Sequence, residues 1–100
     1  MKSQDVFLVS LVAESVLEEK IIAELIGLGA KGYTTYEVRG YGSRGARSSD
    51  VDGKNIKIEV IASKKIADLI MSTCKEKYFD SYGMVGWLTK IDVLRESKFP

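Results

Sequence analysis

The sequence contains no histidine, and this absence argues against several kinds of site at once. Histidine is the commonest protein ligand of metal ions and the usual general base near neutral pH. The one cysteine, Cys74, has no second cysteine in the chain, so an internal disulfide is excluded. The remaining polar residues contain no paired catalytic carboxylates and no nucleophile–base arrangement. We therefore expect neither a metal centre nor an enzyme.

The sequence also lacks an excess of charge of one sign, and it contains no long apolar run. The 15 Lys and Arg residues nearly balance the 14 Asp and Glu residues, and the net charge is +1. This balance gives no general attraction to nucleic acid or anionic lipid, so any anion site has to be local. No apolar stretch approaches the about 20 residues that cross a membrane, and residues 1–5 do not resemble a signal peptide. The sequence predicts a cytoplasmic protein with one domain over residues 1–100.

Residue periodicity predicts four strands and two helices in this domain. An apolar run at 6–12 and largely alternating segments at 33–38, 56–60 and 85–94 indicate the strands. Helical spacing lies between the first and second strands and again between the third and fourth. The order β-α-β-β-α-β is typical of the ferredoxin-like α+β fold, an antiparallel sheet with both helices on one face.

Local signals predict where the helices begin and end. Ser15 followed by Glu18 indicates a capping box at the start of the first helix. Gly27 and Gly29 indicate its end. Ser63 is the predicted cap of the second helix.

The first strand has apolar side chains on both of its faces. Phe7 and Val9 would point to one face, while Leu8 and Val12 would point to the other. Because helices cover one face only, we expect packing between subunits to cover the second face. Trp87 is expected in the core or in this interface.

The loop 40–54 is the unusual segment of the chain. It contains four glycines, three serines and two arginines, and a connection of this length in so small a domain is usually functional or disordered. Glycine backbone N–H groups can approach an anion closely, and Arg44 and Arg47 offer donor pairs that match phosphate oxygens. The residues alone leave two interpretations open: a solvated hairpin connection, which is favoured, and an anion site.

The segment 82–87 is a second candidate. Gly83 and Gly86 would let backbone groups contact a ligand, with Tyr82 as a wall. The plainer interpretation, which is preferred, is a turn followed by a strand glycine that marks a β-bulge.

Three weaker signals have ordinary explanations. Cys74 lies on the inward side of the second helix and is expected to be a small buried hydrophobe. Asp50 and Asp52 are a weak metal signal without further carboxylates. Lys64 and Lys65 open a helix against the preference of its dipole, which either a bound anion or simple exposure explains.

Two stretches resemble the PII family of signalling proteins. Residues 29–34, Gly-Ala-Lys-Gly-Tyr-Thr, and 37–42, Glu-Val-Arg-Gly-Tyr-Gly, are similar to the segment that leads into the T-loop of PII proteins. Residues 42–49, Gly-Ser-Arg-Gly-Ala-Arg-Ser-Ser, are similar to SbtB, the branch of the family that regulates bicarbonate transport. Residues 77–79, followed by Tyr82, also resemble SbtB.

The resemblance implies a homotrimer that binds adenine nucleotides in the clefts between subunits. Gly32, Tyr33 and Thr34 would line the base and ribose. The phosphate would contact Gly42, Ser43, Arg44 and Arg47. The opposing wall would be formed, largely through backbone, by Tyr82, Gly83, Met84 and Val85.

Departures from the family narrow the expected ligand. PII proteins carry a Gly-Asp-Gly-Lys stretch that holds a triphosphate, whereas residues 82–85 contain no lysine. AMP, cyclic AMP or ADP is therefore favoured over ATP, with bicarbonate as a further candidate and no obligatory cofactor. The chain also lacks the two-cysteine tail of some SbtB proteins.

The implied partner is a bicarbonate transporter similar to SbtA, at the cytoplasmic face of the membrane. A carboxysome-associated PII-like protein that senses ADP or AMP with bicarbonate is the alternative. A CutA-like trimer that binds divalent metal is an alternative of another class, which the missing histidine disfavours.

Overall fold

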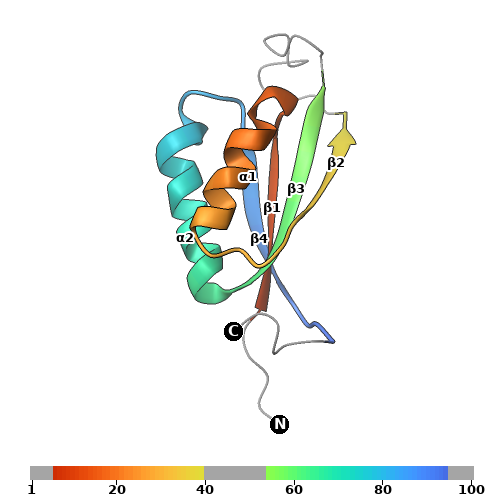
Figure 1. Ribbon diagram of the computed structural model, residues 1–100, viewed down its shortest axis with the longest axis vertical. Coiled ribbons are helices and arrows are strands. Elements are labelled where there is room, and N and C mark those ends of the chain that lie inside the picture. Colours follow the sequence, from red (N-terminus) through yellow and green to blue (C-terminus); the bar gives the residue numbers. More distant parts are fainter. Residues whose placement is uncertain (1–5, 40–53, 95–100) are drawn as a thin grey trace.

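The structure, a computed structural model, describes residues 6–39 and 54–94 (Figure 1). The main elements are β1 (Val6–Glu14), α1 (Glu18–Gly27), β2 (Thr34–Val38), β3 (Asn55–Ser63), α2 (Lys64–Cys74) and β4 (Val85–Ile91). A 3-10 turn, Ser15–Leu17, precedes α1, and a π-helical turn, Lys75–Phe79, follows α2.

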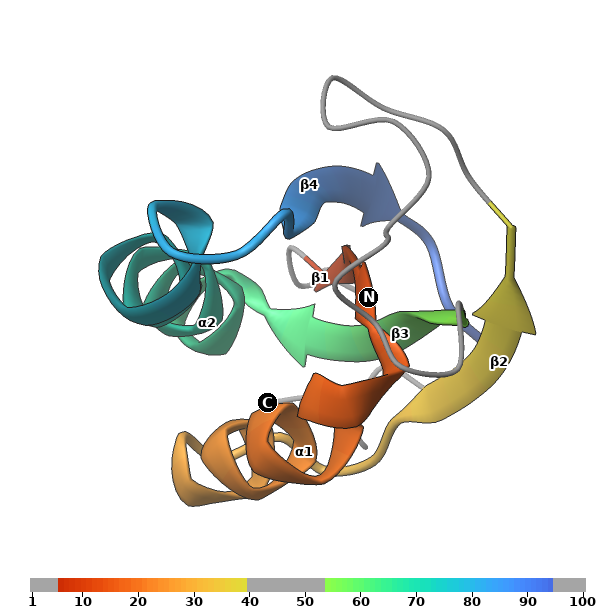
Figure 2. The same cartoon turned by 90° about the horizontal axis from the view of Figure 1, so that it is seen from above.

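The four strands form one antiparallel sheet in the order β2-β3-β1-β4. Both helices lie on the same side of this sheet (Figure 1, Figure 2). This arrangement confirms the predicted ferredoxin-like α+β fold. The edge strands β2 and β4 each have one side without a strand neighbour.

The core lies between the sheet and the helices. Val9, Leu11 and Ala13 of β1 point toward the helices and are at most 1% exposed. Ile21 of α1 and Ile70 of α2 pack in the same cluster and are fully buried. The alternating apolar residues of β3, Ile56, Ile58 and Val60, belong to the same buried cluster.

The other face of the sheet, here called the open face, carries no helix. Tyr36, Val85 and Trp87 lie on it and are 42%, 52% and 40% exposed. Leu8 and Val12 share this face and are partly buried. The predicted apolar character of both faces of β1 is confirmed, and Trp87 belongs to the open face rather than to the core.

The first helix begins differently from the prediction. The chain enters α1 through the 3-10 turn, and the side chains of Glu14 and Leu17, at the two N-cap positions, make no capping hydrogen bond. The backbone N–H of Ser15 donates to the carbonyl of Lys54 at 3.1 Å. Ser15 is thus held by the residue that precedes β3, and one 3-10 turn separates it from the start of α1 at Glu18.

The predicted helix end at Gly29 and the predicted cap at Ser63 are both confirmed. Gly29 has φ +105°, its N–H donates to Ile26, and the next N–H, of Ala30, donates to Leu25. These two bonds form a Schellman motif, in which glycine is favoured because φ is positive. The Oγ atom of Ser63 accepts from the N–H of Ile66 at 3.4 Å.

Gly86 has a packing role and does not mark a bulge. The pairing of β1 with β4 runs without interruption from Val6↔Ile91 to Val12↔Val85, with Leu11 opposite Gly86. A Cβ atom at position 86 would lie 2.9 Å from Leu11 Cδ2 and 3.2 Å from Phe79 Cζ. The π-helical turn therefore packs directly onto the backbone of β4 at this glycine.

We predict that Gly86→Ala lowers the free energy of unfolding by about 1–3 kcal/mol, because the added methyl group overpacks this contact. Gly27→Ala is the matched control, since nothing lies within 4 Å of a Cβ there and the helix gains propensity. Urea denaturation followed by circular dichroism measures both variants. Equal stability of the two variants would show that the contact at Gly86 is not tight.

Candidate functional site

The predicted site residues fall into three groups along the chain. Gly32, Tyr33 and Thr34 are exposed at the start of β2. The second group, Gly42, Ser43, Arg44 and Arg47, lies outside the described residues.

The third group precedes and begins β4. The backbone N–H of Tyr82 donates to the carbonyl of Tyr78 at 2.9 Å, and the two rings lie 6.1 Å apart. The side chain of Met84 is buried in the core, while Val85 is exposed on the open face. Met84 can therefore contact a ligand through its backbone only, as the prediction of a backbone wall allows.

One chain does not bring the first and third groups together. Thr34 belongs to the edge strand β2, and Val85 belongs to the opposite edge strand β4, with β3 and β1 between them. Since neighbouring strands are about 4.8 Å apart, the two edges are separated by roughly 14 Å. A single site containing both groups has to combine the β2 edge of one copy with the β4 edge of another.

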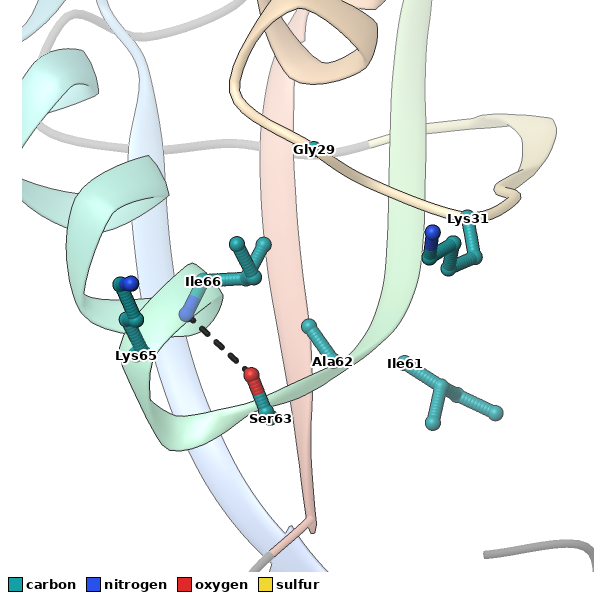
Figure 3. A pocket seen from close by; sticks show the side chains of 7 residues that line it. All are labelled: Gly29, Lys31, Ile61, Ala62, Ser63, Lys65 and Ile66. Carbon is teal, nitrogen blue, oxygen red and sulfur yellow. Dashed lines mark hydrogen bonds between the residues drawn. The ribbon is translucent and has the colours of Figure 1, made fainter. Parts of the chain in front are cut away.

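A pocket of about 310 Å³ includes Lys31, the residue that precedes the first group, but Gly32, Tyr33 and Thr34 do not line it (Figure 3). It is lined by Gly29, Lys31, Ile61, Ala62, Ser63, Lys65 and Ile66. The pocket thus joins the end of β3, the start of α2 and the loop that leads to Gly32. Its volume is at the lower end of the range of small-molecule sites.

The sheet pairing explains why a pocket forms there. β2 pairs with β3 only as far as Thr34↔Glu59, so residues 60–63 of β3 continue without a strand on that side. Backbone N–H and C=O groups of an unpaired strand edge can bond a planar molecule that carries both donors and acceptors. The pocket therefore suits a flat polar ring.

Two lysines give the pocket its charge. Lys31 lies in the loop after α1 and Lys65 in the first turn of α2, and both side chains are drawn in Figure 3. Lys64, in contrast, pairs with Asp68 at 2.9 Å and does not line the pocket. The lysine pair at 64 and 65 was noted in the sequence, whereas the contribution of Lys31, Ile61 and Ala62 gave no sequence signal, because it depends on how far β2 extends.

A second charged cluster lies on the open face. The Lys57 Nζ atom is 3.6 Å from a Glu59 carboxylate oxygen and 5.2 Å from the centre of the Trp87 ring. A hydrogen bond with Tyr36 is the main cause that raises the pKa of Lys57, and Glu59 adds to it. Lys57 therefore stays charged, and its charge is compensated within the face.

Cys74 is not a reactive thiol. Burial raises the pKa of its thiol to about 11, and the side chain is 1% exposed. The thiolate is the nucleophilic form, so the neutral thiol is unreactive near neutral pH. This agrees with the prediction of a small buried hydrophobe.

The described part of the chain offers neither a clustered metal site nor a membrane-spanning helix. Residues 6–39 and 54–94 contain no group of three or more His, Cys, Asp or Glu side chains placed to hold a metal ion. None of the helices formed by these residues has the length and apolar character needed to cross a membrane.

Comparison with known proteins identifies the family. The sequence pattern described as "Nitrogen regulatory protein P-II" matches residues 6–98. The chain belongs to the P-II family. It is a PII-like signalling protein, and PII proteins are signalling proteins rather than enzymes. The match favours PII over the CutA-like alternative.

Solved PII structures have the same fold as this chain. A protein of Thermus thermophilus, described as a PII-like signalling protein, is 41% identical, with all of both chains covered and a TM-score of 0.84. CPII of Thiomonas intermedia, solved with ADP and bicarbonate, is 23% identical over 99% of this chain and 98% of that one, with a TM-score of 0.85. GlnK of B. subtilis is 24% identical over 89% and 87%, with a TM-score of 0.67. The PII resemblance is thus confirmed, while the SbtB branch stays a prediction.

Proposed function

We propose that this PII-like protein senses adenine nucleotides at a site between subunits. The observation that carries the proposal is the pocket at the unpaired edge of β3, which Lys31 lines directly before the predicted residues Gly32, Tyr33 and Thr34. It offers backbone donors and acceptors, an apolar lining and two lysines, which together suit a purine base attached to an anionic group. ADP and AMP are bound in structures of CPII, and ATP in a structure of GlnK.

The rest of the nucleotide lies, in this proposal, between two chains. The base occupies the pocket of one copy, and the backbone at Gly83 and Met84 of a second copy forms the opposite wall. The phosphate contacts Gly42, Ser43, Arg44 and Arg47 of the loop 40–54. Because residues 82–85 contain no lysine, AMP, cyclic AMP and ADP bind more tightly than ATP.

The assembly that builds this site is a homotrimer, and PII proteins are generally trimeric. The open face supplies the contact, because its exposed Tyr36, Val85 and Trp87 side chains gain from being covered. The same contact places one copy's β4 edge beside the next copy's β2 edge.

The signal is passed to a membrane transporter. We propose an SbtB-like role, in which the nucleotide changes the conformation of the loop 40–54 and so the affinity for an SbtA-like bicarbonate transporter. The alternative is a CPII-like role in which bicarbonate is itself a ligand, favoured by the CPII structure that contains ADP and bicarbonate.

Calorimetric titration with AMP, cyclic AMP, ADP and ATP tests the site. We expect binding to wild type and an affinity at least about tenfold lower in Arg44→Ala/Arg47→Ala, since charge-assisted hydrogen bonds are lost. Adenosine, which lacks phosphate, should bind both proteins equally. Lys20→Ala/Lys75→Ala removes the same charge from exposed helix positions and should bind like wild type. Absence of binding by every nucleotide would refute the proposed function.

The trimer is tested by light scattering at micromolar concentration. Wild type should have three times the mass of the 11.1 kDa chain. Thr89→Lys, on the open face opposite Leu8, should dissociate the trimer, because it places a charge where subunits meet. Ile26→Lys, at a 58% exposed position of α1, is the control and should stay trimeric. A monomeric wild type would contradict the site between subunits.

The partner is tested by capture from solubilised membranes with immobilised protein. We expect a bicarbonate transporter to bind, with recovery that changes when cyclic AMP is replaced by ADP. Bicarbonate should not change the affinity for ADP in this role. A bicarbonate-dependent affinity for ADP together with no captured transporter would favour the CPII-like alternative instead.

A further inference from the structure

An ion pair joins α1 to the π-helical turn that precedes β4. The Lys77 Nζ atom lies 2.9 Å from Glu24 Oε1, and 24% of the Glu24 side chain is exposed. The hydrogen bond with Glu24 is the main cause that raises the pKa of Lys77, so the lysine stays charged near neutral pH. The two residues are 53 positions apart in the sequence, so the pair connects two separate parts of the fold.

Glu24 lies on a firmly packed helix. Ile21 and Leu25, which are close to it on α1, are fully buried in the core. Because a close-packed core resists displacement, α1 provides a fixed point for the ion pair. The same helix ends at Gly29 and leads to Lys31, which lines the pocket.

Lys77 lies on the segment that leads to the predicted backbone wall. The N–H of Tyr82 donates to the carbonyl of Tyr78 at 2.9 Å, and Gly83 and Met84 follow directly. The position of the π-helical turn therefore sets where the chain enters the wall.

The position of this turn includes an unfavourable group. The side chain of Tyr78 is 1% exposed, and its buried hydroxyl has no hydrogen-bond partner among the described residues. A buried hydroxyl without a partner opposes the arrangement that buries it. The ion pair with α1 acts in the other direction, because it stabilises the turn in this position.

We propose that Glu24 and Lys77 are positioning residues for the nucleotide site. Their ion pair holds the turn 75–79 against α1 and so keeps the backbone at Gly83 and Met84 in place as the wall. Neither side chain touches the ligand. The inference rests on the proposed nucleotide site. It makes α1 the common support of the pocket of one chain and of the wall that this chain gives to the next copy.

The strength of the ion pair limits the expected effect. A partly exposed ion pair contributes modestly, because water screens it. When the pair is lost, the turn leaves its position for part of the time, and the apparent affinity falls with the fraction of protein that is still competent to bind. We therefore expect a fall of roughly two- to fivefold.

Calorimetric titration with AMP and with adenosine tests the proposal. Glu24→Gln and Lys77→Met should each weaken the binding of both ligands by the same factor, because the wall contacts the base. Adenosine is uncharged, so a change in the overall charge of the protein does not explain its weaker binding. Glu19→Gln and Lys75→Met make the same changes at exposed positions of the same two elements and should bind like wild type.

The charge-reversed variant Glu24→Lys/Lys77→Glu rebuilds the ion pair and should restore most of the affinity. A role that depends on either residue alone would not be rescued in this way. All variants should keep the oligomeric mass of wild type in light scattering.

Amide hydrogen exchange of the ligand-free protein gives a second reading. The N–H of Tyr82 should exchange roughly two- to fivefold faster in Glu24→Gln than in wild type, because the turn opens more often. Glu19→Gln should exchange like wild type.

The proposal requires both readings to change. Wild-type affinity or wild-type exchange in Glu24→Gln would overturn it, as would a charge-reversed variant that binds as weakly as the single variants. A change in oligomeric mass would show that the pair supports assembly rather than the wall. If wild type binds no nucleotide, the proposed function fails, whereas normal binding by both wild type and Glu24→Gln refutes this inference alone.

Discussion

The structure depends on a mismatch between the lengths of two neighbouring strands. β3 has nine residues and β2 has five, so β2 leaves the last part of β3 without a partner. An unpaired strand edge has to find hydrogen bonds elsewhere, in water or in a ligand. The same shortfall leaves room for the chain between α1 and β2 to pass over the end of β3 and close the pocket. Pocket and free backbone groups thus arise from one feature.

The turn at Gly29 fixes the position of that passing segment. The Schellman motif satisfies the last carbonyls of α1 and reverses the chain, so that Lys31 reaches the pocket within two residues. A side chain at position 29 would meet strain from the positive φ and would also approach Ile66 Cδ1 at 3.1 Å. The position of the segment that closes the pocket is therefore set by backbone geometry.

Periodicity was enough to predict the fold, because each element carries a clear pattern. Alternation indicated that β3 is half exposed, and the order β-α-β-β-α-β placed both helices on one face. The candidate site was harder to predict. Lys31, Ile61 and Ala62 become neighbours only because β2 stops pairing with β3 at Glu59. Gly86 shows a similar limit: a strand glycine signals close approach of another group or a bulge, and the sequence does not reveal that Phe79 is the group. The 3-10 turn before α1 has the same origin, because the N–H of Ser15 is bonded to Lys54, a residue 39 positions away in the sequence.

In an isolated chain, several groups have no binding partner, and a ligand or a second subunit can supply one. The open face exposes apolar side chains, the edge of β3 exposes backbone groups, and the buried Asn55 Oδ1 atom has no hydrogen-bond partner. Each of these groups gains a partner when a ligand or another subunit binds. Any molecule that binds only the folded form stabilises it by mass action. Binding at one of these places changes the free energy of binding at another only if the two places share a structural element. β3 is shared by all three, since it borders the pocket, carries Asn55 and contributes Lys57 and Glu59 to the open face. A ligand in the pocket, a neighbouring subunit and a donor to Asn55 would thus all act on the same strand, which leads directly back into the loop 40–54.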